Sequence, residues 1–99
     1  MAATPRAMIA RRVVVHGRVQ GVGYRDAAVQ AAYAIGVAGW VRNVRDGTVE
    51  AHAQGDPQAV ERFVEWCRRG PPLARVSGVD VSDAHPEASL RDFSWRATT

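Results

Sequence analysis

Residues 20–25 of this 99-residue chain, Gln-Gly-Val-Gly-Tyr-Arg, combine residue types that can bind an anion. They join a predicted strand to a predicted helix, and the two glycines let successive backbone N–H groups point toward one spot. The helix N-terminus adds partial positive charge there, and Arg25 in the first turn can bind an anion through two parallel hydrogen bonds. The segment therefore predicts a phosphate- or carboxylate-binding loop.

The same residues also fit a plain tight turn followed by a solvated arginine. An arginine in the first helical turn opposes the helix dipole, and such a local mismatch favours a functional role. The loop does not have the G-x-G-x-x-G spacing of dinucleotide-binding loops, so we do not expect it to bind a dinucleotide.

Asn43 lies just before a predicted hairpin turn at residues 46–47. A neutral amide can hold a water molecule without adding negative charge, although asparagine is also a common turn residue at such a place. Counting back from a two-residue turn puts Asn43 on the polar side of its strand, with Glu50, whereas a bulge at the turn would reverse the count. The same count puts Arg42 on the apolar side, with Val49.

Composition excludes several other kinds of chemistry. All thirteen basic residues are arginine, so Schiff-base chemistry and a Walker-A lysine are ruled out. Cys67 is the single cysteine and lies on an apolar helical stripe, which favours a buried filler over a reactive thiol. The three histidines have no metal-ligand spacing, and we expect no metal and no cofactor. The net charge of +3 favours anionic partners.

The apolar pattern predicts a single domain over residues 11–99 after a flexible tail at residues 1–10. Alternation and helical spacing give the order strand, helix, strand, strand, helix, strand and a final strand. The predicted elements cover residues 12–18, 24–35, 39–44, 48–53, 57–69, 74–81 and 91–97. This is the α+β split βαβ, or ferredoxin-like, order, with two helices on one face of a largely antiparallel sheet and the first and third strands inside it.

Two finer details follow from the same pattern. The alternation of the strand at 74–81 changes phase at Ser77-Gly78, which predicts a β-bulge. The three tryptophans, Trp40, Trp66 and Trp95, lie on separate elements, and we interpret them as core or rim residues.

Five segments of the chain, read together, resemble the sequence signature of the acylphosphatases. They are residues 16–25 (HGRVQGVGYR), 36–43 (GVAGWVRN), 46–50 (DGTVE), 54–56 (QGD) and 70–76 (GPPLARV). The resemblance extends from about residue 12 to residue 95 and follows the predicted order of elements. Tyr24 stands where the family often has phenylalanine.

The resemblance implies a metal-independent hydrolase that splits acyl phosphates into a carboxylate and inorganic phosphate. By that resemblance Arg25 and the loop amides bind the phosphoryl group, and Asn43 positions the attacking water. The substrate-binding residues it implies are Gln20, Gly21, Val22, Gly23, Tyr24 and Arg25. Such chemistry needs positioning and charge stabilisation more than acid–base groups, because a carboxylate leaves unaided.

Two alternatives remain open at this stage. The first is a non-catalytic ferredoxin-like module that binds RNA or phosphorylated ligands, but the strand at 48–53 has no aromatic residue on which bases would stack. The second is an accessory relative of larger carbamoyl-transferring enzymes, from which we would expect Arg25 or Asn43 to be absent. We expect a cytoplasmic monomer that takes a small acyl phosphate, releases inorganic phosphate and has no membrane or nucleic-acid partner.

Overall fold

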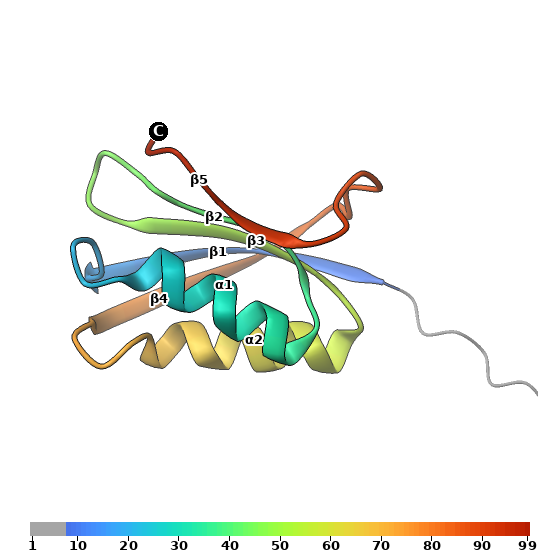
Figure 1. The fold of residues 1–99 in the computed structure, drawn as a ribbon, viewed down its shortest axis with the longest axis horizontal. Helices are drawn as coiled ribbons and strands as arrows, with labels where there is room; N and C mark the ends of the chain where they lie inside the picture. The colour runs from blue at the N-terminus through green and yellow to red at the C-terminus, as the bar shows by residue number, and fades with distance from the viewer. Residues whose placement is uncertain (1–7) are drawn as a thin grey trace, which may run out of the picture.

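The computed structural model describes residues 8–99, which form a five-stranded sheet with two helices on one face (Figure 1). The elements are β1 (Ile9–Arg18), α1 (Tyr24–Ile35), β2 (Ala38–Asn43), β3 (Val49–Gly55), α2 (Pro57–Arg69), β4 (Arg75–Ala84) and β5 (Phe93–Arg96). The strand order is β4-β1-β3-β2-β5, and all neighbours are antiparallel except β2 and β5. The ferredoxin-like order expected from the sequence is confirmed, with β1 and β3 inside the sheet.

The ends of the elements follow local sequence signals. Asp56 accepts a hydrogen bond from the Gln58 amide and is followed by proline at the first position of α2. Gly36 ends α1 in a left-handed conformation, and its N–H donates to the Ala32 carbonyl. β1 already begins at Ile9, so the last residues of the expected tail belong to the sheet; its residues 1–7 lie outside the described part of the chain.

The core lies between the helices and the sheet. Its strand residues are mostly valine and alanine, and after Tyr24 those of α1 are alanine, which lets this helix lie close to the sheet. Fully buried members include Val13, Val15, Val41, Val49, Ala53, Ala28, Ala32, Val60 and Phe63. Cys67 is buried among them, and burial raises the pKa of its thiol to about 12, so it is a packing residue as expected. No helix of the described residues is long and apolar enough to cross a membrane.

The opposite face of β3 is polar but also buried. Glu50 receives hydrogen bonds from Arg12 (Nε to Oε2, 2.6 Å) and Arg42 (Nε to Oε1, 2.8 Å). Burial acts to raise the pKa of Glu50, but the two guanidinium groups outweigh it and hold the pKa below its usual value. Trp40 covers this face, with the guanidinium carbons of Arg42 and Arg96 each 4.7 Å from its ring centroid.

The predicted sides of Asn43 and Arg42 were wrong. The register pairs Asn43 with Val49 and Arg42 with Glu50, so Asn43 lies on the helix-covered side and Arg42 on the polar side. The cause is a three-residue loop at 45–47 in place of a two-residue turn, closed by the Val44 amide and the Thr48 carbonyl at 2.9 Å. One extra loop residue moves every strand side chain to the other face.

The predicted β-bulge in β4 is confirmed. His16 pairs with Gly78, but Gly17 pairs with Val76, so Ser77 is an extra residue without a partner in β1. The backbone of β4 comes so close at this point that a Cβ on Gly17 would lie 2.1 Å from the Arg75 carbonyl oxygen. The φ of Gly17 is also +121°, so glycine is required there for two reasons.

Candidate active site

The loops at 19–23, 44–48 and 70–74 lie at the same end of the molecule, on the left in Figure 1. Between the first two lies a cavity of about 220 Å³ at the N-terminus of α1. It is lined by the glycine loop, the first turn of α1, Asn43 and Trp95. The structure therefore brings together both residues to which a catalytic role was assigned from the sequence, Arg25 and Asn43.

The glycine loop leaves backbone N–H groups available beside this cavity. Gly21 (φ +73°) and Gly23 (φ +77°) are both left-handed, a conformation that side chains disfavour. Gly23 caps α1 without a side-chain hydrogen bond, and within residues 8–99 the amides of Tyr24, Arg25 and Asp26 donate to no acceptor. An uncapped helix N-terminus preceded by left-handed glycines is a ready anion site.

Arg25 is held at the rim of the cavity by neutral groups. Its Nη1 donates to the Arg96 carbonyl at 3.2 Å, and its guanidinium carbon lies 4.9 Å from the Trp95 ring centroid. Within the described residues Arg25 forms no ion pair, so no carboxylate there neutralises its charge. Asp26 also lines the cavity, but its side chain is exposed to solvent in the first turn of α1.

Asn43 ends β2, and the C-terminal segment fixes its backbone. The Thr99 amide donates to the Asn43 carbonyl at 3.1 Å, and the Arg45 amide donates to the Thr99 carbonyl at 2.9 Å. Because Asn43 lies on the helix-covered side of the sheet, its side chain lines the same cavity as Arg25. The corrected register thus brings Asn43 toward the glycine loop.

The side chains of Gln20 and Tyr24, both predicted to bind substrate, are used for structure. Gln20 Nε2 donates to the Val44 carbonyl at 2.7 Å and to the Thr48 carbonyl at 2.9 Å, which ties the glycine loop to the hairpin loop. The Tyr24 hydroxyl is buried and donates to the Cys67 carbonyl at 2.7 Å. That carbonyl lies in the last turn of α2, where carbonyls have no intrahelical donor.

The side chains of these two residues are therefore engaged outside the cavity, and of the two only Tyr24 lines it. Burial, followed by the effect of neighbouring Cys67, raises the pKa of Tyr24, so the hydroxyl stays protonated and keeps donating. Val22 packs against the core with its side chain. Gly21, Gly23, Tyr24 and Arg25 are the predicted binding residues that line the cavity.

Trp95 is a site residue that the sequence reading did not identify. Its ring is 55% exposed, lines the cavity and supports Arg25. The signal that would have found it is its alternation with Phe93, which is buried in the core. Two residues on the same side of β5 share the helix-covered face, and the second of them reaches the N-terminus of α1.

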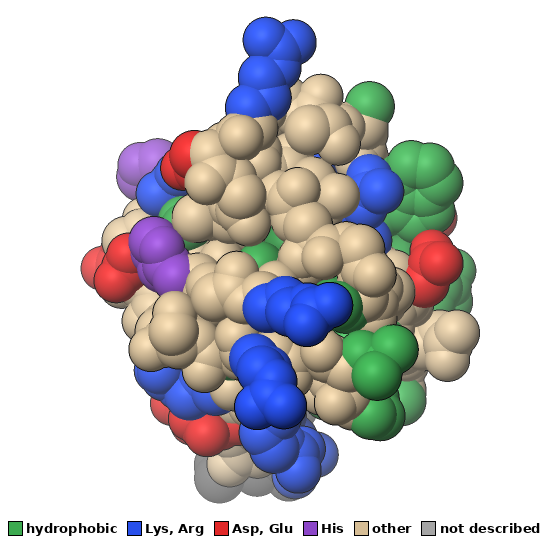
Figure 2. Space-filling view, turned by 90° about the vertical axis from the view of Figure 1, so that its left-hand side faces the viewer, with side chains coloured by type: hydrophobic (Ala, Val, Ile, Leu, Met, Phe, Trp, Pro, Cys, Tyr) green, Lys and Arg blue, Asp and Glu red, His purple; other side chains and the backbone are tan. Residues whose placement is uncertain are grey.

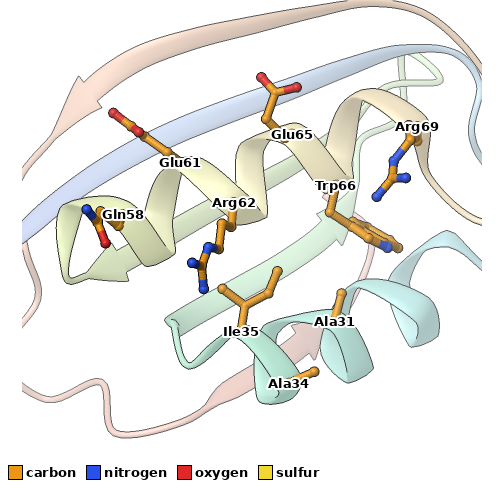
Figure 3. A pocket seen from close by; sticks show the side chains of 9 residues that line it. All are labelled: Ala31, Ala34, Ile35, Gln58, Glu61, Arg62, Glu65, Trp66 and Arg69. Carbon is orange, nitrogen blue, oxygen red and sulfur yellow. The ribbon is translucent and has the colours of Figure 1, made fainter.

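A larger hollow, about 770 Å³, lies elsewhere, in an open groove between α1 and α2. Figure 3 shows Arg62 and Trp66 directed from α2 toward α1, while Glu61 and Glu65 point away from it. Its walls are side chains of the two helices, and no glycine loop lines it; the N-terminus of α2, at Gln58, is already capped by Asp56. The smaller cavity is therefore the candidate site, because there backbone N–H groups, a guanidinium and an amide converge.

Comparison with known proteins shows which family the chain belongs to. Residues 11–95 match the family model described as Acylphosphatase. The chain is 56% identical over 84 residues to an acylphosphatase of Nocardioides sp., covering 85% of this chain and 84% of that protein. It is 50% identical over 82 residues to one of Methylococcus capsulatus, covering 83% and 89%. The crystal structure of an acylphosphatase from Bacillus subtilis superposes with a TM-score of 0.84 at 36% identity, covering 89% of this chain and 98% of that one. The chain belongs to the acylphosphatase family.

Proposed function

We propose that this protein hydrolyses the carboxyl–phosphate bond of acyl phosphates to a carboxylate and inorganic phosphate, without a metal ion. In this proposal the loop amides and Arg25 bind the phosphoryl group, and Asn43 positions the attacking water. The observation that carries it is the cavity in which an uncapped helix N-terminus, an arginine without a carboxylate partner and Asn43 lie together. Its volume of about 220 Å³ suits a small substrate, since drug-sized ligands occupy roughly 300–1,000 Å³.

The reaction needs charge stabilisation and alignment. Arg25 exchanges its neutral contacts, the Arg96 carbonyl and the Trp95 ring, for two phosphoryl oxygens. Asn43 accepts a hydrogen bond from the water and directs its oxygen at phosphorus, in line with the bond that breaks. The P–O bond to the acyl group then breaks, its electron pair leaves with the carboxylate, and the water proton passes to phosphate or solvent.

No strong general acid is required, because the leaving group is already a stable anion. The conjugate acid of a carboxylate has a pKa of roughly 4, so it departs without protonation at neutral pH. A carboxylate in place of Asn43 would repel the phosphoryl oxygens, whereas an amide does not. The residues that line the cavity supply what remains, which is positive potential for the transferring phosphoryl group.

The RNA-binding alternative has less support. β3, which is central in the sheet, carries no aromatic residue, and Trp40 on the same face is buried beneath Arg42 and Arg96. A stacking surface of the kind that RNA-recognition domains use would need exposed rings there. We propose instead that the domain at residues 11–99 works as a cytoplasmic monomer on small acyl phosphates.

The experiment is hydrolysis of benzoyl phosphate in the presence of EDTA, for the unaltered protein and for Arg25→Ala and Asn43→Ala. Arg25→Ala should lower turnover by about a thousandfold, as for arginines that stabilise phosphoryl transfer elsewhere. Asn43→Ala should lower turnover but leave competitive inhibition by inorganic phosphate nearly unchanged. Arg45→Ala is the matched control, since this exposed arginine lies in the neighbouring hairpin loop outside the cavity lining. Turnover that survives Arg25→Ala would refute the proposal, and so would equal loss of phosphate binding in both variants.

A further inference from the structure

A second cavity, of about 410 Å³, lies on the other side of the glycine loop. Its walls are the loop at Gly21 and Val22, the segment 72–74 and two arginines, Arg18 and Arg75. Gly21 lines both cavities, so they meet at this residue. Within residues 8–99, no heavy atom outside its chain neighbours lies within 4 Å of the position that a Cβ on Gly21 would take.

The bulge in β4 creates the basic end of this cavity. Without the extra residue Ser77, the register of β1 and β4 would place Val76 opposite Arg18. With it, Arg18 pairs directly with Arg75, and their side chains share one face of the sheet. A bulge next to an active site commonly serves to redirect a side chain, and here it replaces a valine with a second guanidinium.

Two like charges directly opposite each other are unfavourable unless a counter-charge lies between them. No acidic residue lines the cavity, and within residues 8–99 neither arginine forms an ion pair. Other arginines of this chain do have carboxylate partners, as Arg12 and Arg42 have in Glu50. In Figure 2, which views this end of the molecule, basic side chains follow one another down the middle while acidic ones lie toward the margins.

We propose that Arg18 and Arg75 form a second anion site that binds a carboxylate or phosphate group beside the phosphoryl site. The proposal rests on the proposed function in one respect: the substrate that suits both sites is an acyl phosphate whose acyl part ends in a second anionic group. The phosphoryl group of this substrate occupies the first cavity, and its acyl chain passes over Gly21. The second anionic group then accepts hydrogen bonds from the guanidinium groups of Arg18 and Arg75. A free anion that is not part of the substrate could bind the same two arginines. The test below distinguishes such an anion from the second anionic group of the substrate.

The test compares kcat/KM for acetyl phosphate, which has no second charge, with kcat/KM for succinyl phosphate, which ends in a carboxylate. Arg18→Gln and Arg75→Gln should each lower the value for succinyl phosphate about tenfold and the value for acetyl phosphate less than about twofold. The matched control is Arg45→Gln, which removes the same charge from the same end of the molecule but outside both cavities and should change the ratio of the two values less than about twofold. In parallel, inorganic phosphate is titrated calorimetrically to count the anions bound per chain.

Selective loss on succinyl phosphate would support the site and assign its ligand to the far end of the substrate. A second equivalent of bound phosphate that disappears in Arg75→Gln, without substrate selectivity, would support the site with a free anion as its ligand. An unchanged substrate ratio together with one equivalent in all variants would overturn the proposal. Absence of turnover on both substrates would refute the proposed function instead, and the phosphate count would still decide whether the second site exists.

Discussion

Replacing Gln20 by methionine would test whether the two loops of the active site act as one unit. Methionine keeps nearly the same volume but removes the amide that donates to the Val44 and Thr48 carbonyls. Each neutral hydrogen bond contributes about 0.5–1.5 kcal/mol. Both carbonyls keep another donor, because Val44 receives Gly47 N–H and Thr48 receives Val44 N–H. Neither carbonyl is left without a donor, so the free energy of unfolding should fall by only about 1–2 kcal/mol, which lowers Tm by about 5–10 °C.

The larger effect is expected on turnover. Gln20 ties the glycine loop, which we propose binds the phosphoryl group, to the hairpin loop, next to which we propose that Asn43 holds the water. A small misplacement of reacting groups costs on the order of tenfold to a hundredfold. We therefore expect kcat on benzoyl phosphate to fall at least about tenfold, with inhibition by inorganic phosphate changed less than about twofold.

Gln58→Met is the matched control, because it makes the same exchange at an exposed position of α2 in the open groove. It should leave Tm and kcat unchanged. A Gln20→Met protein with lowered Tm but full kcat would show that the bridge is structural only and would refute the reasoning. Loss of inhibition by inorganic phosphate would also refute it, because phosphate binding by the glycine loop would then itself require Gln20.

Three other variants test single contacts. Tyr24→Phe should cost about 1–2 kcal/mol of unfolding free energy in urea titration because the buried Cys67 carbonyl loses its donor, while Tyr33→Phe, at a side chain 69% exposed, should cost nothing measurable. The pKa of Glu50 is lowered in the folded protein, so its ion pairs stabilise at neutral pH and this contribution is lost as pH falls below about 4. Glu50→Gln should therefore be less stable at pH 7 and approach the unaltered protein in acid; a stability difference independent of pH would contradict this. Gly17→Ala should lower the free energy of unfolding, measured by thermal denaturation, by about 2–3 kcal/mol or more. The reason is that its Cβ would lie 2.1 Å from the β4 backbone, at a φ that alanine disfavours.

Most of the fold could be predicted from local sequence signals. Proline after Asp56, glycine after α1 and the alternation of the strands are all short-range patterns, and each marks an element that the structure confirms. The phase change at Ser77 likewise predicted the bulge. These signals succeed because capping, turn geometry and pleating depend on residues within a few positions of one another.

The errors and omissions concern contacts over longer distances. The side of Asn43 depended on whether the hairpin loop has two or three residues, and an Asp-Gly pair is compatible with both. The bridge from Gln20 to the hairpin loop joins residues more than 20 positions apart, and that from Tyr24 to Cys67 more than 40. No periodicity in the sequence reports such a contact, so the structural roles of these two side chains could not be predicted.

The distribution of arginine partners explains how a chain of net charge +3 can concentrate positive potential at one end. On the polar face of the sheet, Arg12 and Arg42 share the carboxylate of Glu50, so one of their two positive charges is compensated there. At the loop end, Arg25 is held by a carbonyl and an aromatic ring, which fix its position without neutralising it. Neutral contacts thus keep a guanidinium ready for an anion, whereas an ion pair would have to be broken first. Because such a field acts over roughly 10 Å at moderate ionic strength, it also raises the local concentration of anionic substrate, and the rate of capture should fall as salt is added.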